Sequence, residues 1–270
     1  HQVVPDYMVW RMYANPMIGI TVKDQKVVTY DYNGSENYFM YVKPAESGKP
    51  YQLYYAPVSA PKGWQPLSLT GLPSDGLLIS QITEYNKALY VPATNGTLYR
   101  SEDGLTWSAV ENAPSVKYVL GSVKQGTKQP SALATIVDQE GKLAFYAMNE
   151  SMEWIAGDAV PSGFPVTGFS NLQYAAMYRE YLMTASGRTV DNQVVSTTWA
   201  TMDGISWALM ASGDANFTKR EGAMITNYDD KFFLIGGIDA SNKALKDMYQ
   251  SIDYGISWSL IDSMVVLPTD

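Results

Sequence analysis

The sequence contains no cysteine and almost no histidine. Its 270 residues include a single His, at position 1. The absence of cysteine excludes disulfides, a thiol nucleophile and a cysteine metal site. One terminal imidazole excludes a histidine-based catalytic triad and leaves almost no basis for a zinc centre. We therefore expect no metal and no cofactor, and the sequence assigns no catalytic residue.

Long apolar runs and clusters of basic residues are also missing. No apolar run approaches the ~20 residues of a membrane-spanning helix, and no signal peptide is recognisable. Lys and Arg number 19 against 27 Asp and Glu, which gives a net charge of -8. This balance argues against nucleic acid or an anionic membrane surface as a partner.

Aromatic residues, in contrast, are abundant. The chain has 20 Tyr and 7 Trp, and 46% of its residues are hydrophobic. Aromatic side chains favour β-strands, and this much apolar content supports a sizeable core. No long stretch shows the 3.6-residue period of an amphipathic helix. The composition therefore predicts an all-β protein with very little helix.

One turn pattern recurs along the chain: Ser or Thr, Asp two residues later, then Gly and Trp. The hydroxyl and carboxylate can accept hydrogen bonds from nearby backbone N–H groups, the Gly supplies a positive φ, and the Trp begins the next strand. We interpret the Asp as a structural acceptor and not as a metal ligand or catalytic acid. The positions are Ser101, Asp103, Gly104 and Trp107; Thr201, Asp203, Gly204 and Trp207; and Ser251, Asp253, Gly255 and Trp258.

The tryptophans of these turns define a repeat. Trp64, Trp107, Trp154, Trp207 and Trp258 are 43, 47, 53 and 51 residues apart, and each follows another aromatic residue by eight or nine positions. A period of this size, built from short strands, is typical of propeller blades. We predict a single β-propeller of four-stranded antiparallel blades, with repeats at about 25–70, 76–112, 116–158, 166–212 and 221–262.

The two ends of the chain suggest a further, composite blade. Residues 7–13, 18–22 and 265–267 each have the composition of a strand. Joined together, the terminal segments 1–24 and 263–270 would close the ring and remove its exposed sheet edges. Within the second repeat, residues 77–85 alternate moderately and are expected to form its first strand.

These turns resemble a known motif. Residues 251–258 are similar to the Asp-box, or BNR, pattern, and the turns at Ser101 and Thr201 resemble its variant that is one residue shorter. Residues 232–237, Phe-Phe-Leu-Ile-Gly-Gly, followed by Tyr249 and Trp258, resemble a kelch repeat. The resemblance spans about residues 25–261 and implies a propeller whose Asp-box turns lie away from the axial site.

The same resemblance guides what we expect about location and partners. The chain looks like uncharacterised secreted or lipid-anchored bacterial propellers, and its lack of cysteine is compatible with an oxidising compartment. We expect an extracytoplasmic protein that is secreted, periplasmic or lipid-anchored. We also expect a monomer without a membrane span, and its start at His1 leaves open that it is one domain of a longer chain.

Asp-box propellers include sialidases, other glycosidases and many proteins without enzymatic activity. A sialidase requires three convergent arginines, and the candidates here are Arg11, Arg100, Arg179, Arg188 and Arg220, which we interpret as surface residues. A hydrolase with two carboxylates stays open, although the sequence does not identify the pair.

Two hypotheses about function follow. The first is a non-catalytic propeller that binds a glycan or a protein through loops at one end of the axis, with ligand-binding residues not yet assigned. The alternative is a glycoside hydrolase with an axial active site. Two carboxyl groups facing each other across a central pocket at roughly 5–10 Å would favour the enzyme.

Overall fold

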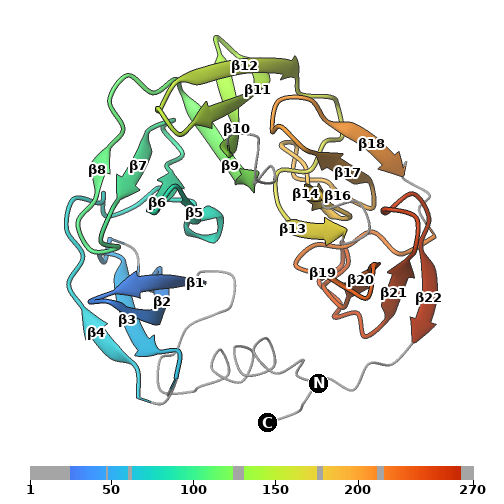
Figure 1. The fold of residues 1–270 in the computed structure, drawn as a ribbon, viewed down its shortest axis with the longest axis horizontal. Helices are drawn as coiled ribbons and strands as arrows, with labels where there is room; N and C mark the ends of the chain where they lie inside the picture. Colours follow the sequence, from blue (N-terminus) through green and yellow to red (C-terminus); the bar gives the residue numbers. More distant parts are fainter. Residues whose placement is uncertain are drawn as a thin grey trace.

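The computed structural model describes residues 25–46, 48–59, 63–123, 131–174, 179–211 and 216–262. These residues form five four-stranded antiparallel sheets that surround a common centre as the blades of a β-propeller (Figure 1). Helical structure in this part of the chain is limited to one 3-10 turn, η2 (Ile79–Gln81). The predictions of an all-β propeller and of very little helix are confirmed.

Each blade takes its four main strands from one continuous region of sequence. Blade 1 contains β1 (Gln25–Tyr32), β2 (Ser35–Val42), β3 (Gln52–Pro57) and β4 (Gln65–Leu67). Blade 2 contains β5 (Thr83–Tyr85), β6 (Ala88–Pro92), β7 (Leu98–Ser101) and β8 (Ser108–Ala109). Blade 3 contains β9 (Val116–Val123), β10 (Ala132–Gln139), β11 (Lys142–Asn149) and β12 (Trp154–Ala159). Blade 4 contains β13 (Phe169–Tyr174), β14 (Arg179–Thr184), β17 (Thr198–Thr201) and β18 (Ala208–Ala211). Blade 5 contains β19 (Met224–Tyr228), β20 (Lys231–Ile235), β21 (Met248–Ser251) and β22 (Ser259–Asp262).

The first strand of each blade is the innermost and the last is at the periphery (Figure 1). Because the strands form an antiparallel meander, alternate connections lie at opposite ends of each blade. The connections between first and second strands and between third and fourth strands share one end, which we call the turn end. The connections between second and third strands and those between blades share the other, which we call the loop end. In blade 4 the loop end includes a small hairpin of β15 (Gly187–Arg188) and β16 (Val194–Val195).

The core lies between the blades. Four hydrophobic clusters of described residues join blade 1 to 2, 2 to 3, 3 to 4 and 4 to 5. Aromatic rings fill much of this space, as where Phe164 packs edge-on against Trp199 and Trp207 with ring centroids 5.3 and 5.1 Å apart. Because side chains alternate across a sheet, successive residues of an inner strand face the interfaces on opposite sides of the blade. All five residues of β6 are buried for this reason.

One expectation about strands is wrong, and another lies outside the residues that the structure describes. Residues 77–85 were expected to form one strand, but the chain forms η2 there and only Thr83–Tyr85 is extended. The turn closes because the backbone N–H of Ile82 donates to the carbonyl of Ile79, and the three-residue spacing of these two side chains lets both be buried. The predicted composite blade from residues 1–24 and 263–270 lies outside the described residues.

Candidate functional site

The residues of the predicted turns lie at the turn end of blades 2, 4 and 5. In blade 2, Asp103 Oδ1 accepts hydrogen bonds from the backbone N–H groups of Leu105 and Thr106 at 2.8 and 2.7 Å. The Ser101 hydroxyl donates to the same oxygen at 3.0 Å. The carboxylate is therefore occupied by its own turn.

The other two turns repeat these contacts. Asp203 Oδ1 accepts from the N–H groups of Ile205 and Ser206, at 3.0 and 2.8 Å, and from the Thr201 hydroxyl at 3.0 Å. In blade 5, Asp253 accepts from the N–H of Ser257 at 2.9 Å and from the hydroxyl of Ser251 at 2.8 Å. In both turns the hydroxyl oxygen also accepts a backbone hydrogen bond, from the N–H of Gly204 at 2.9 Å and of Gly255 at 2.8 Å.

The glycine of each turn packs against the preceding blade. All three have a positive φ, and a Cβ on Gly104 would lie 2.8 Å from Cδ2 of Phe39 and closer still to Cε2. A Cβ on Gly204 would lie 2.9 Å from Ala134, and one on Gly255 would lie 2.8 Å from Thr198. The turns therefore join blades as well as strands.

The tryptophans of the turns differ in their surroundings. Trp107 and Trp258 are buried, whereas Trp207 is half-buried among aromatic rings of blades 3 and 4. The Trp258 indole N–H donates to Thr198 Oγ1 across the boundary between blades at 3.2 Å. The assignment of these turns to the Asp-box or kelch type stays a prediction.

The hydrogen bonds of the turns also determine their acidity. Burial alone would raise the pKa of the Asp103 carboxyl, but hydrogen bonds from Thr106, Leu105 and Ser101 outweigh it and lower that pKa below its ordinary value. The same balance, with Ser257 and Ser251 as donors, lowers the pKa of Asp253. A general acid needs the opposite shift, so these carboxylates suit a structural role.

The loop end has a repeated feature that the sequence interpretation missed. Three five-residue loops close with the same pair of backbone hydrogen bonds: 93–97, 189–193 and 239–243. In each loop the N–H of the first residue donates to the carbonyl of the fifth, and the N–H of the fourth residue donates to the carbonyl of the first. The fourth residue has a positive φ in each: Gly96, Asn192 and Asn242. Gly or Asn at that position was the available signal, because these residues tolerate the left-handed conformation.

Each of these loops is tied to the segment that leads into an innermost strand. Isolated bridges join Leu77 to Ala93, Pro165 to Thr189 and Glu221 to Ile238. In blade 5 the bridge consists of two hydrogen bonds of 2.9 Å between the backbones of Glu221 and Ile238. The loops are thereby held at the inner side of the loop end and do not extend freely into solvent.

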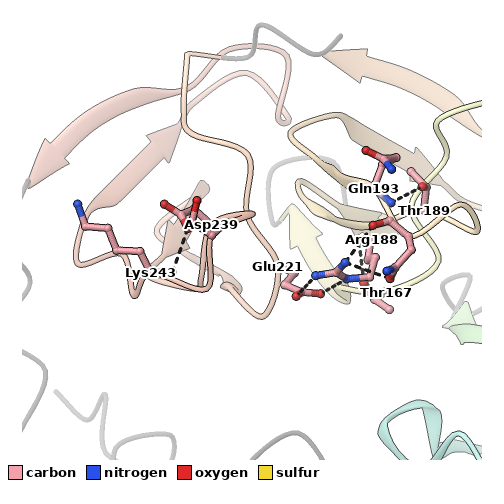
Figure 2. Close-up of polar contacts among 9 residues, drawn as sticks. Thr167, Arg188, Thr189, Gln193, Glu221, Asp239 and Lys243 are labelled. Carbon is pink, nitrogen blue, oxygen red and sulfur yellow. Dashed lines mark hydrogen bonds and ion pairs between the residues drawn. The ribbon is translucent and has the colours of Figure 1, made fainter.

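The loops of blades 4 and 5 are linked by one ion pair. Arg188 Nε donates to Glu221 Oε2 at 2.7 Å, and Nη2 donates to Oε1. On its other side, Nη1 donates to the carbonyl and the side-chain Oδ1 of Asn192 at 2.9 and 3.0 Å. Figure 2 shows Glu221 between the two loops, with Arg188 on one side and Asp239 and Lys243 on the other.

Further hydrogen bonds hold this cluster in place. The backbone N–H of Arg188 donates to the hydroxyl of Thr167 at 2.9 Å, and the N–H of Gln193 donates to the hydroxyl of Thr189 at 3.1 Å. In blade 5, Asp239 Oδ1 accepts from the N–H of Lys243 at 3.0 Å. The exposed fractions of the Arg188 and Glu221 side chains are 28% and 23%, so both are held and still reach solvent.

The interpretation of the arginines as surface residues is wrong for Arg220. Its side chain is completely buried, and its guanidinium donates to Asp247 Oδ1 and Oδ2 at 2.5 and 2.9 Å and to the Gly236 carbonyl at 2.9 Å. The guanidinium also lies over the rings of Phe217 and Tyr249, 5.6 and 5.3 Å from their centroids. A buried charge requires such a partner, and the partner lies far away in the sequence.

Arg100 lies away from the cluster of Arg188, Glu221 and Asn192. Arg100 donates to the Tyr90 hydroxyl at 3.0 Å and pairs with Glu102 at 2.7 Å in blade 2. Arg179 belongs to β14, and Arg11 lies outside the described residues. Within the described part of the chain, no group of three or more His, Cys, Asp and Glu side chains could hold a metal ion, and no helix has the length and apolar character needed to cross a membrane.

Comparison with known proteins places this fold in a family. The model of the family described as "DUF6242 beta propeller domain" matches residues 4–270. No curated protein sequence matches the chain. Among solved structures, the one titled "Structure of YjhT" is similar, with a TM-score of 0.56 and 9% sequence identity. The match covers 91% of this chain and 85% of that one, and at this identity it supports the fold alone.

Proposed function

The chain belongs to the family of DUF6242 beta propeller domains, and we propose that it is a non-catalytic, extracytoplasmic binding propeller. Its ligand, a glycan or a protein, is engaged through the loop end of the axis. The observation that carries this proposal is the cluster of Arg188, Glu221 and Asn192, which joins the loops of blades 4 and 5. Binding sites of propellers and other closed β-folds commonly occupy such an end.

The contrast between the two ends of the blades supports the proposal. At the turn end, Asp103, Asp203 and Asp253 use their carboxylates within their own turns. At the loop end, polar side chains are fixed by neighbours and still reach solvent, as Arg188 and Glu221 do. Groups fixed before binding lose little conformational entropy when a ligand arrives, so the loop end is the better binding surface.

Three carboxyl groups are poorly suited to act as the acid of a hydrolase. A glycosidase needs one acid whose pKa is raised, so that it is protonated at neutral pH. The pKa shifts of Asp75, Asp103 and Asp253 are all downward. For Asp75 the largest cause is its hydrogen bond from Lys43. These three carboxyls therefore stay ionised, and none serves as a general acid.

A paired binding and turnover assay tests the proposal. The purified domain is applied to a glycan array and to a panel of fluorogenic glycosides, together with two variants. Asn192→Ala changes the loop end, and Asp229→Ala, at an exposed residue of the turn end, is the matched control. Binding without turnover that is weakened by Asn192→Ala alone is the expected result.

The opposite results are equally clear. Turnover of any glycoside would contradict a non-catalytic role. Binding that is weakened by Asp229→Ala and not by Asn192→Ala would contradict the choice of the loop end. The proposed extracytoplasmic location is tested separately, by fractionating native cells: the protein is expected in the medium, the periplasmic fraction or the membrane fraction, and recovery in the cytoplasmic fraction alone would contradict it.

A further inference from the structure

We infer that the ligand of the loop end of blades 4 and 5 is a neutral glycan, recognised by its hydroxyl groups at the cluster of Arg188, Glu221 and Asn192. This inference rests on the proposed function and specifies its ligand class. A neutral glycan as the ligand distinguishes this site from sites that bind acidic sugars and from sites that bind proteins.

The charge of the cluster is already balanced. Glu221 faces Arg188 along the side formed by Nε and Nη2, so the guanidinium has a carboxylate in the place where an acidic ligand would bind. A carboxylated sugar would have to displace Glu221 and leave that half-buried carboxylate without its cation. Such a loss is costly, because removing one partner of a paired charge leaves the other uncompensated.

The hydrogen-bond geometry suits hydroxyl groups. Arg188 is held from both sides, by Glu221 and by the carbonyl and Oδ1 of Asn192, so its plane cannot rotate freely. A sugar hydroxyl both donates and accepts, so two neighbouring hydroxyls can accept from a guanidinium and donate to a carboxylate together. Of the two N–H groups on Nη2, one donates to Glu221, and the other lies beside that carboxylate as a donor for a hydroxyl. The ion pair thus combines one donor and one carboxylate acceptor with no net charge.

The position of apolar side chains argues against a protein as the ligand at this end. Val190 is the one large hydrophobic residue exposed at the loop end among the described residues. The other exposed large hydrophobics of that part of the chain lie on β12, β18 and β22, on connections of the turn end, or, for Tyr228, at the turn end of β19. Protein interfaces depend on buried aromatic and apolar anchors, which this end does not offer.

Specificity can be tested by removing one charge of the pair. The probes are neutral oligosaccharides and matched oligosaccharides that carry a uronic or sialic acid, each measured at low and high NaCl. Wild type should bind the neutral series, with an affinity that salt changes little because no net charge is neutralised. Arg188→Met should weaken this binding about tenfold or more, as expected for the loss of charge-assisted hydrogen bonds.

Glu221→Gln is the most informative variant, because it should change the binding of neutral and acidic glycans in opposite directions. It keeps the shape of the side chain but leaves the Arg188 charge uncompensated, so binding of the neutral series should fall while binding of the acidic series rises and becomes dependent on salt. Lys43→Met is the control, because Lys43 forms an exposed ion pair with Asp75 at the loop end of blade 1. It should leave both series unchanged. Thermal unfolding of each variant establishes that it is folded, and Asn192→Ala replaces Arg188→Met if the latter does not fold.

The remaining outcomes separate this inference from the proposed function. Wild-type binding of the acidic series that is lost in Arg188→Met would overturn the neutral-glycan inference and leave the loop end as the binding site. Binding of neutral glycans that none of the Arg188, Glu221 and Asn192 variants affects would overturn both. Absence of binding to either series would overturn the inference, because it requires a neutral glycan to bind.

Discussion

Replacing Gly104 by Ala tests whether the repeated turns hold neighbouring blades together. Gly104 has a φ of +74°, and a Cβ there would meet the ring of Phe39 and lie 3.0 Å from the hydroxyl of Tyr41. Gly34 is a matched control, because its φ is +72° and a Cβ on it would meet nothing within 4 Å. Both substitutions place Ala in the left-handed region, but only the first also crowds an interface between blades.

The expected magnitudes follow from these two terms. The left-handed conformation costs a residue with a side chain about 1–2 kcal/mol, and this applies to both variants. Inserting a methyl group into a packed core costs about 1–3 kcal/mol more, and this applies to Gly104→Ala alone. The Phe39 ring and the Tyr41 hydroxyl, which donates to the Gly104 carbonyl at 2.8 Å, have little room to move. We therefore expect Gly104→Ala to lower the free energy of unfolding by about 2–5 kcal/mol.

Urea denaturation followed by tryptophan fluorescence measures both variants under identical conditions. The midpoint should fall further for Gly104→Ala than for Gly34→Ala, at an unchanged slope. A second substitution, Phe39→Leu, should recover part of the loss in the Gly104→Ala background by making room for the methyl group. Equal stability of the two single variants would refute the conclusion that this turn packs tightly against the preceding blade.

Three further predictions concern the contacts of Thr198, Arg220 and Asp103. Thr198→Val removes the acceptor of the Trp258 indole N–H and should lower the free energy of unfolding by about 1–3 kcal/mol in urea denaturation; an unchanged midpoint would contradict it. Arg220→Met leaves Asp247 without its cation and should cost about 3–5 kcal/mol, whereas the same substitution combined with Asp247→Leu should cost less; equal losses would show that the pairing is unimportant. Hydrogen bonds hold the folded-state pKa of Asp103 below 3.8, so its contribution to stability is complete above that value and is lost as pH falls through the folded-state pKa. Asp103→Asn should therefore flatten the acid side of a stability–pH curve, and a parallel curve would argue against this role.

The turn end was predictable because its contacts are local. Ser101, Asp103 and Thr106 interact within six positions of sequence, so the residue pattern contains almost all the information that the turn needs. The loop end was not, because the partners there come from different parts of the chain. Arg188 and Glu221 are 33 positions apart, and Arg220 and Asp247 are 27 apart. Taken singly, each arginine has the ordinary properties of a surface residue.

The repeated unit of this protein could be read from its sequence: short strands, recurring Trp residues and hydroxyl–Asp–Gly turns with a regular period, which together predict a propeller of four-stranded sheets. These features depend on local hydrogen bonding and on the alternation of side chains, and both can be read from neighbouring residues. Three features became visible only in the folded chain: Gly104 lies against Phe39, Arg220 is buried, and Arg188 and Glu221 join two loops into one surface. The physical reason is that burial and charge pairing depend on groups that only the packing of separate blades brings together.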